Sequence, residues 1–269
     1  MKGIGYFAFG DVRLREEPAR DPCFRVVRHD AEMKTFEGTG DLARREAVHR
    51  HMTNEITSLD IAAQCLAEFP DAPWGLRLEL ARQCWDESRH VAGLHRRLTE
   101  MNGFKGEFPI SAFEWNVTCA IDTLAGRLAS QNRTFEAGAM DVVGGNIEAW
   151  REAGDEATAD VLDAILADEI QHVRFANRWL RAMLDQDRRV LLHIAAAVRF
   201  VAHANAVLHA RSAGIEAVTE AKAHAAAQAP AVNVEDRRLA EFSDEEIHEI
   251  LRQAGFRSLV PEPAAGHTS

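Results

Sequence analysis

The chain repeats one short motif, Asp-Glu-x-x-His, inside two helical patterns of apolar residues. The first copy is Asp86-Glu87-Ser-Arg-His90 and the second is Asp168-Glu169-Ile-Gln-His172. Residues three apart lie on one face of an α-helix, so the Glu and the His of each copy can reach the same metal ion. A Glu on an apolar helix face is costly to bury unless a cation compensates it. The repeat therefore favours a helical protein with a buried metal site.

Four stripes of apolar residues at helical spacing predict four long helices. They run over residues 48–69, 80–98, 117–139 and 162–183, and Pro70–Pro73, Asn102-Gly103 and Gly144-Gly145 are the expected breaks between them. Asp155 is the expected N-cap of the fourth helix. The first and third helices each carry a single candidate ligand, Glu55 and Glu136. Two helices with one Glu and two with Glu-x-x-His form the ligand scheme of ferritin-like dimetal bundles.

The spacing of these glutamates predicts how the helices connect. Glu55 and Glu87 are 32 residues apart, and Glu136 and Glu169 are 33 apart, which suits two helical hairpins with their ligands at equal height. Glu87 and Glu136 are 49 residues apart, too far for a tight hairpin. If residues 102–112 run back extended, at about 3.3 Å per residue, helices two and three are parallel. We therefore expect an all-α, ferritin-like four-helix bundle with a long crossover between helices two and three.

The motifs resemble the ferritin-like superfamily of carboxylate-bridged dimetal (di-iron) proteins. Three short sequence segments are similar to a bacterial ferritin-like family of largely unassigned function. They are Asn54-Glu55-Ile-Thr-Ser-Leu-Asp, Arg133-Thr-Phe-Glu136 and Asp168-Glu169-Ile-Gln-His172-Val. The resemblance covers about residues 45–185. It implies a non-haem dimetal site at which O2 can react, and it gives no substrate.

The candidate metal ligands are six residues with distinct expected roles. They are Glu55, Glu87, His90, Glu136, Glu169 and His172. Glu87 and Glu169 are expected to bridge the metals and to be the catalytic pair, Glu55 and Glu136 to be terminal ligands, and each His to bind one metal. Asp86 and Asp168 are expected to accept the distal N–H of a His across the bundle, with a solvent-facing Asp as the alternative. Iron suits this mixed ligation, and manganese is also compatible.

Other histidines receive a less specific interpretation. Glu46-Ala-Val-His49 and Glu245-Glu-Ile-His248 repeat the Glu-x-x-His spacing but lie among charged residues, so a solvated helix face is expected for both. His51 precedes Glu55 by one turn and is expected at the surface or as a hydrogen-bond partner of a ligand, an additional ligand being the alternative.

The ends of the chain are expected to extend the bundle. Residues 1–40 predict an N-terminal extension of short strands or irregular chain, 41–187 the dimetal bundle, and 188–269 a C-terminal helical extension and tail. Ser243 is an expected cap of a short last helix. The stretch from Val190 to Leu208 is interrupted by polar residues and is judged a poor membrane span.

Composition limits the compartment and the partners. Four cysteines without a CxxC pair suit a reducing compartment, and the N-terminus shows no secretory signal, so a cytoplasmic protein without a membrane partner is expected. A formal net charge of -11 argues against a nucleic-acid-binding surface. We expect a monomer or homodimer.

The expected function is that of an O2-dependent di-iron oxidoreductase, an oxidase or monooxygenase acting on a small organic substrate, with an electron donor as a further partner. The alternatives are a ferroxidase or iron-storage protein and a manganese catalase. A radical-storing ribonucleotide reductase subunit is excluded because the only tyrosine, Tyr6, lies outside the predicted bundle. A tRNA hydroxylase is disfavoured by the acidic balance. The sequence leaves the substrate and the reaction open.

Overall fold

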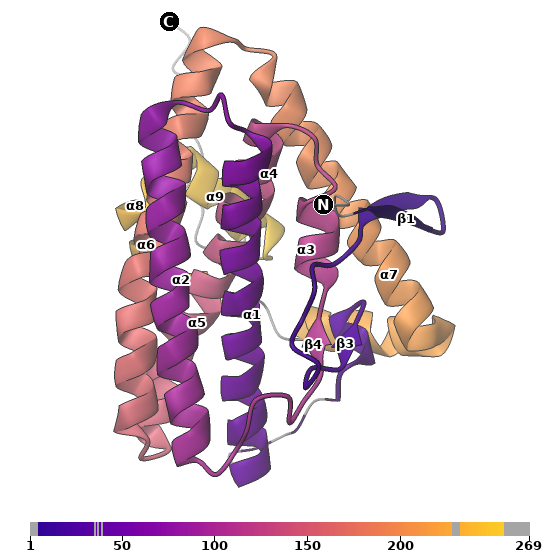
Figure 1. The fold of residues 1–269 in the computed structure, drawn as a ribbon, viewed down its shortest axis with the longest axis vertical. Helices are drawn as coiled ribbons and strands as arrows, with labels where there is room; N and C mark the ends of the chain where they lie inside the picture. The colour runs from indigo at the N-terminus through magenta and orange to yellow at the C-terminus, as the bar shows by residue number, and fades with distance from the viewer. Residues whose placement is uncertain (1–4, 35, 37, 39, 228–231, 256–269) are drawn as a thin grey trace, which may run out of the picture.

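The computed structural model describes residues 5–34, 36, 38, 40–227 and 232–255. Most of these residues are helical, so the predicted all-α class is confirmed. Four helical segments run along the long axis of the molecule (Figure 1). They are α1 (Asp41–Glu68), α2 (Trp74–Glu100), a third segment made of α4 (Leu124–Ser130), the π-helix η2 (Gln131–Glu136) and α5 (Ala137–Glu152), and α6 (Glu156–Gln186).

The helices α1 and α2 form the predicted hairpin. Helix α1 ends just before Pro70, and Pro73 precedes the first residue of α2 because proline fits the start of a helix but not its interior. Asn102 follows α2 with a φ of 61°, the left-handed conformation that ends many helices. The expected break at residues 102–103 is confirmed.

A crossover connects α2 to the third helical segment, and α2 and α5 run in the same direction, as expected (Figure 1). The crossover is not wholly extended. It contains the short strand β4 (Ile110–Ser111), which pairs in parallel with β3 (Val26–Val27), and the helix α3 (Phe113–Thr118). Val117, predicted in the third long helix, therefore belongs to α3. The third helix begins at Leu124, where the Thr123 side chain caps it by accepting from the Gly126 N–H.

The π-helix shifts the buried face of the third segment. The apolar pattern places Phe135 and Ala139 in the core, but the structure buries Glu136 and Met140 instead and leaves Phe135 and Ala139 on a cavity wall. A π-helix has i to i+5 hydrogen bonds and adds a residue to the turn. The predicted stop at Gly144-Gly145 is also wrong, since α5 continues through both glycines to Glu152.

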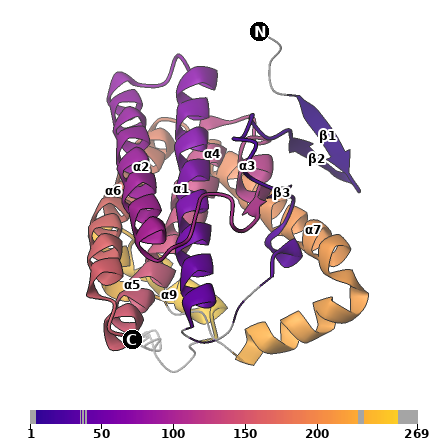
Figure 2. The same cartoon turned by 60° about the horizontal axis from the view of Figure 1, so that its bottom comes forward.

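The remaining elements cover the four helical segments. The N-terminal part contains the hairpin β1 (Tyr6–Phe9) and β2 (Val12–Arg15), strand β3 and the short 3-10 helix η1 (Asp30–Glu32), as expected. The C-terminal part contains α7 (Val190–Ala227), α8 (Val234–Leu239) and α9 (Asp244–Gln253), with Ser243 capping α9 and Asp155 capping α6, both as predicted. Helix α7 crosses the molecule beside α3 and α4 (Figures 1 and 2). The predicted tail, residues 261–269, lies outside the described residues.

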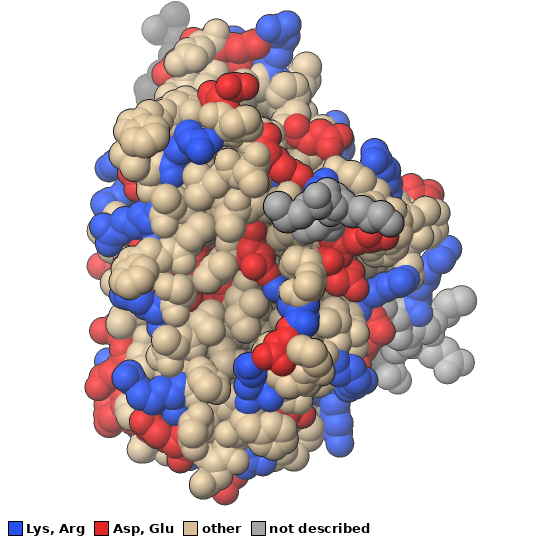
Figure 3. Space-filling model, viewed as in Figure 1, with Lys and Arg blue, Asp and Glu red and all other residues tan. Residues whose placement is uncertain are grey.

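Surface features bear on the membrane and nucleic-acid predictions. Val190–Arg211 in α7 is long and apolar enough to cross a membrane by length and composition, despite its polar residues, and 17% of its most apolar window is buried. One such helix is a weak indication of a membrane span. Basic and acidic side chains are interspersed over the face seen in Figure 3.

Two apolar clusters lie along the helices, and the predicted ligands lie between them in sequence. One cluster includes Ile61, Cys65, Leu76, Leu80, Ala176 and Leu180. The other includes Val48, Met52, Leu94, Leu98, Leu162 and Ile165. Along its own helix, each of Glu55, Glu87 and Glu169 lies between the residues that pack in the first cluster and those that pack in the second. The packing therefore holds three carboxylates at one level of the interior.

Candidate metal centre

The six predicted ligands converge in the structure into two overlapping groups. One group is Glu55, Glu87, His90 and Glu169, and the other is Glu87, Glu136, Glu169 and His172. Within each group, one donor atom from every residue lies within 4.8 Å of the others. Glu87 and Glu169 belong to both groups, while each His and each remaining Glu belongs to one. The arrangement offers two adjacent positions for a cation, with two carboxylates shared between them.

These side chains are all deeply buried, the most exposed being Glu55 at 5%. Both carboxylate oxygens of Glu169 and Nδ1 of His172 have no hydrogen-bond partner among the described residues. The nearest imidazole nitrogens to Glu169 are Nδ1 of His172 at 3.4 Å and Nδ1 of His90 at 3.5 Å. Buried polar atoms are nearly always paired in folded proteins. Unpaired oxygen and nitrogen atoms that converge on one point therefore fit the ligands of a metal ion.

Each imidazole presents Nδ1 to the carboxylates and Nε2 to an aspartate. Nδ1 of His90 lies 3.1 Å from Glu87 and 3.3 Å from Glu55, while its Nε2 lies 3.2 Å from Asp168. Nε2 of His172 lies 3.4 Å from Asp86. An aspartate accepting the Nε2–H fixes the tautomer that leaves Nδ1 free to bind a metal. The structure therefore brings Asp86 and Asp168 to the histidines of the opposite motif.

Arg89 connects the two aspartates. Its guanidinium donates to Asp168 at 2.8 Å and also to Asp86. Arg82 contributes a second contact to Asp86 at 3.2 Å. Because Arg89 occupies an x position of its motif, the spacing of acidic and His residues alone does not single it out.

Three buried amides complete the surroundings of the carboxylates. Gln83 donates to Glu87 at 3.1 Å and to Glu136 at 3.0 Å, and Asn132 donates to the Gln83 carbonyl at 3.1 Å. Gln131 donates to Glu136 at 2.8 Å. Gln131 and Glu136 are five residues apart and would diverge on an α-helix, but the π-helix places them together. Sequence reasoning missed the contact of Gln131 with Glu136 because it assumed an α-helical period.

Burial and mutual repulsion perturb the glutamates strongly. Burial, followed by the negative charge of Glu136, raises the pKa of both Glu87 and Glu169 well above 4.5. Burial also opposes ionisation of Glu55, but hydrogen bonds from His51 and His90 outweigh it and lower its pKa. Glu87 and Glu169 thus resist ionisation, whereas Glu55 and Glu136 stay charged. Bound cations would stabilise a site with such a set of carboxyl groups.

The pKa values of the two histidines are also raised, which favours their charged form. Burial lowers the pKa of His90, yet the hydrogen bonds that its imidazole donates to Glu55 and Glu87 prevail and raise it to about 10. The pKa of His172 is raised well above 6.5 by Glu169 and Asp86 against the effect of burial. Protons on these imidazoles thus balance charge that divalent metals would otherwise balance.

Two expectations about the other histidines meet different outcomes. His51 Nε2 lies 2.7 Å from Glu55, as expected for a partner of a ligand. The solvated-face interpretation is wrong for Glu46 and His49, which are 7% and 0% exposed. His49 Nε2 accepts from the Gly106 N–H at 3.1 Å, and Glu46 pairs with Arg50, so both have structural roles. Glu245 is exposed, as expected.

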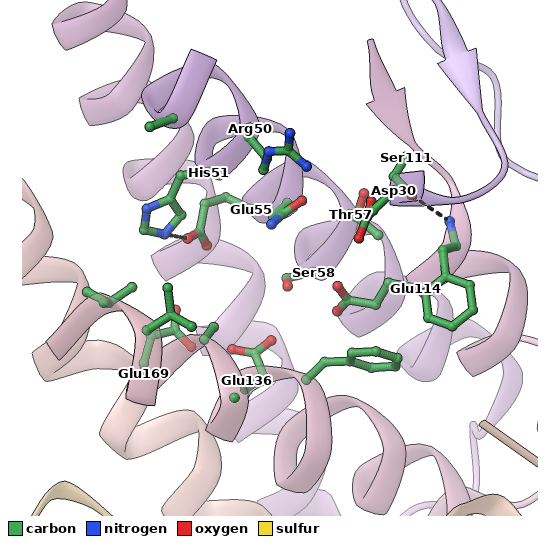
Figure 4. A pocket seen from close by; sticks show the side chains of 18 of the residues that line it. Asp30, Arg50, His51, Glu55, Thr57, Ser58, Ser111, Glu114, Glu136 and Glu169 are labelled. Carbon is green, nitrogen blue, oxygen red and sulfur yellow. Dashed lines mark hydrogen bonds and ion pairs between the residues drawn. The ribbon is translucent and has the colours of Figure 1, made fainter. Parts of the chain in front are cut away.

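A cavity of about 770 Å³ lies beside the cluster, between α1 and α5. Glu55, Glu136 and Glu169 reach its wall (Figure 4). Glu114 of α3 also lines it, and its Oε1 accepts from Gln131 at 2.8 Å. Burial and the nearby Glu136 raise the pKa of Glu114 to about 8. Glu114 was not predicted, since it lies in the crossover, outside the expected helices.

A profile of the family described as "Protein of unknown function (DUF455)" matches residues 7–248. The chain belongs to this family. The match includes all six candidate ligands and extends over α7 and α8, beyond the region of the ferritin-like resemblance. Neither the curated proteins nor the solved structures contain a match to the chain.

Proposed function

We propose that the chain is a ferritin-like, non-haem dimetal oxidoreductase that uses O2 to oxidise a small organic molecule. The observation that carries the proposal is the pair of buried four-residue groups that share Glu87 and Glu169 and contain one His each. Carboxylate-rich sites with one imidazole per metal suit iron or manganese, and this ligand set on four helices is that of ferritin-like dimetal bundles. Iron is the metal we favour.

In this proposal, Glu87 and Glu169 would contribute to both metal positions, Glu55 and His90 would complete one, and Glu136 and His172 would complete the other. Bound iron would supply the redox chemistry through which O2 is reduced. Asp86 and Asp168 keep the imidazoles in the Nδ1-binding tautomer. Gln83 and Gln131 hold the orientation of Glu136 by donating to it.

The cavity favours an enzyme over an iron store. Its volume of about 770 Å³ falls in the range of small-molecule sites, and three of the candidate ligands form part of its wall. A substrate in it would lie against the candidate metal ligands. A manganese catalase needs access only for hydrogen peroxide, so a large cavity gives that alternative less support.

Oxygen uptake by the iron-loaded protein tests the proposal. With a reductant supplied, the wild type should consume O2, and Glu87→Ala and His172→Ala should lose that activity. Glu79→Ala, at an exposed position of α2, is the matched control and should retain it. Wild-type protein that binds no metal, or ligand variants with normal metal content and O2 uptake, would contradict the proposal.

The same preparation separates the alternatives. A large shell-forming assembly that accumulates many irons per chain would favour storage, and disproportionation of hydrogen peroxide by the manganese form would favour a catalase. A monomer or dimer with two metals and substrate-dependent O2 uptake is the result that we expect.

A further inference from the structure

The cavity beside the metal ligands has two chemically different arms. The apolar arm follows α5 away from Glu136 and is lined by Val48, Leu94, Val142, Val143, Trp150 and Leu162. The second arm lies toward η1, β4 and α3 and is called polar here because Asp30, Thr57, Ser58, Ser111 and Glu114 line it, beside the rings of Phe113 and Phe135 (Figure 4). Glu55, Glu136 and Glu169 lie where the arms meet. A molecule that fills both arms therefore needs one apolar end and one polar end.

The polar arm holds two acidic side chains, Asp30 and Glu114, that no described basic side chain in the arm pairs with. Nδ1 of His29 accepts from the Ala31 N–H and its Nε2 faces Asn205 Oδ1 at 3.0 Å, so both ring nitrogens are engaged away from Asp30 and Glu114. Arg50, the one Arg or Lys among the described residues lining the cavity, is paired with Glu46. The carboxylates of Asp30 and Glu114 thus face the cavity without a basic partner of their own there.

Glu114 is the carboxylate best placed to fix a ligand relative to the metal site. The Gln131 amide nitrogen lies 2.8 Å from Glu114 and 2.8 Å from Glu136, so one side chain joins the cavity carboxylate to a candidate metal ligand. The Glu114 carboxylate points into the same space as Ser58 and Glu136 (Figure 4). Only its Oε1 is engaged by Gln131, which leaves Oε2 for a ligand.

We propose that the substrate is an organic amine, held through its ammonium group at Glu114 with its apolar part in the arm along α5. That the amine is oxidised rests on the proposed function, whereas binding of the amine depends only on the cavity. An ammonium group beside Glu114 would offset the effect of burial and favour the ionised carboxylate, and the resulting charge-assisted hydrogen bond is stronger than one to a neutral donor. The carbons between the ammonium group and the apolar part would then lie nearest to the candidate metal ligands.

Binding of matched ligands tests the inference. The probes are 4-phenylbutylamine, 4-phenylbutanol and 4-phenylbutyrate, measured by calorimetry against metal-loaded protein without O2. A charge-assisted hydrogen bond predicts that the amine binds about 10- to 100-fold more tightly than the alcohol. The carboxylate should bind most weakly, because it meets like charge.

Two variants locate the effect. Glu114→Gln preserves shape and should bring the amine and the alcohol to within about twofold of each other, since the charge is gone. Glu79→Gln makes the same change in net charge at an exposed position of α2 and should keep the wild-type preference. Equal binding of amine and alcohol by the wild type, or a preference that survives Glu114→Gln, would overturn the inference.

Metal content measured on the same samples separates this inference from the proposed function. Both variants should hold as much metal as the wild type. Bound metal with no preference for the amine contradicts only the amine assignment. An amine preference in protein that cannot bind metal contradicts only the proposed function.

Discussion

Nε2 of His90, on α2, lies 3.2 Å from a carboxylate oxygen of Asp168, on α6. His172 on α6 has the reciprocal relationship with Asp86 on α2, at 3.4 Å. The Asp that precedes each motif glutamate thus serves the histidine of the other motif. This exchange explains why both motifs carry Asp-Glu rather than Glu alone, and it ties two helices together at the level of the candidate metal site.

Removing one of these acceptors should weaken metal binding without removing a ligand. Asp168→Asn keeps the size of the side chain but no longer favours the required tautomer of His90, so affinity should fall by about 10- to 100-fold. Competition with a chelator measures this. Asp163→Asn, an exposed change on the same helix, should leave affinity unchanged. Equal affinities in the two variants would contradict the orienting role of Asp168.

The Arg89 guanidinium should contribute a smaller effect, because it holds the aspartates rather than the histidines. Arg89 is 45% exposed at its side chain, and ion pairs of this kind contribute about 0.2–1 kcal/mol each. Arg89→Gln should therefore lower metal affinity by about 2- to 10-fold. Arg89→Lys should recover part of the loss, and Arg96→Gln, exposed on the same helix, should lose nothing. A loss as large in Arg96→Gln as in Arg89→Gln would show a general charge effect.

The long helices, Glu55 and the two Glu-x-x-His pairs could be predicted because they depend on local periodicity and on chemistry that apolar burial makes conspicuous. Glu55 and Glu87 stand out because the apolar stripe continues on either side of them, through Met52 and Leu59 around Glu55 and through Cys84 and Val91 around Glu87. Glu136 was harder. It lies outside the apolar stripe at an α-helical period, and only the π-helix brings it onto the buried face.

The parts that escaped prediction depend on contacts between distant segments. Glu114 becomes part of the cavity only because the crossover returns beside α1 and pairs β4 with β3. His49 looked solvated from its charged neighbours, but the segment around Gly106 folds over it. Gly144 and Gly145 do not end their helix, because α6 packs against α5 and outweighs their weak helix propensity.

Without metal, Glu169→Gln should stabilise the fold at neutral to alkaline pH. The folded-state pKa of Glu169 lies above the usual 4.5, so its contribution to the unfolding free energy is present below pH 4.5 and is lost as pH rises. The variant avoids this loss and should exceed the metal-free wild type by about 1–3 kcal/mol at pH 8.

Urea unfolding with and without chelator measures this difference. With metal present the order should reverse, because only the wild type gains the free energy of two bound ions. A Glu169→Gln protein that is less stable than the wild type at pH 8 after chelation would show that the carboxylate is stabilised by the fold alone.

His49 should make the stability of the protein depend on pH in the acid range. Burial lowers its folded-state pKa to about 4, while the unfolded chain takes up the proton near 6.5. Stability should therefore fall as pH decreases from about 6.5 to 4, by up to ~1.4 kcal/mol per pH unit. Unfolding of His49→Gln should show a flatter profile over this range, whereas His95→Gln, exposed on α2, should follow the wild type. Identical profiles for the wild type and His49→Gln would contradict the assignment.

The most direct test of the dimetal centre is anomalous X-ray diffraction from crystals of the protein loaded with iron. We expect two anomalous peaks per chain within the cluster, one beside Nδ1 of His90 and one beside Nδ1 of His172, with Glu87 and Glu169 between them. Crystals that show no peak there after loading, or a single ion held elsewhere in the chain, would contradict it.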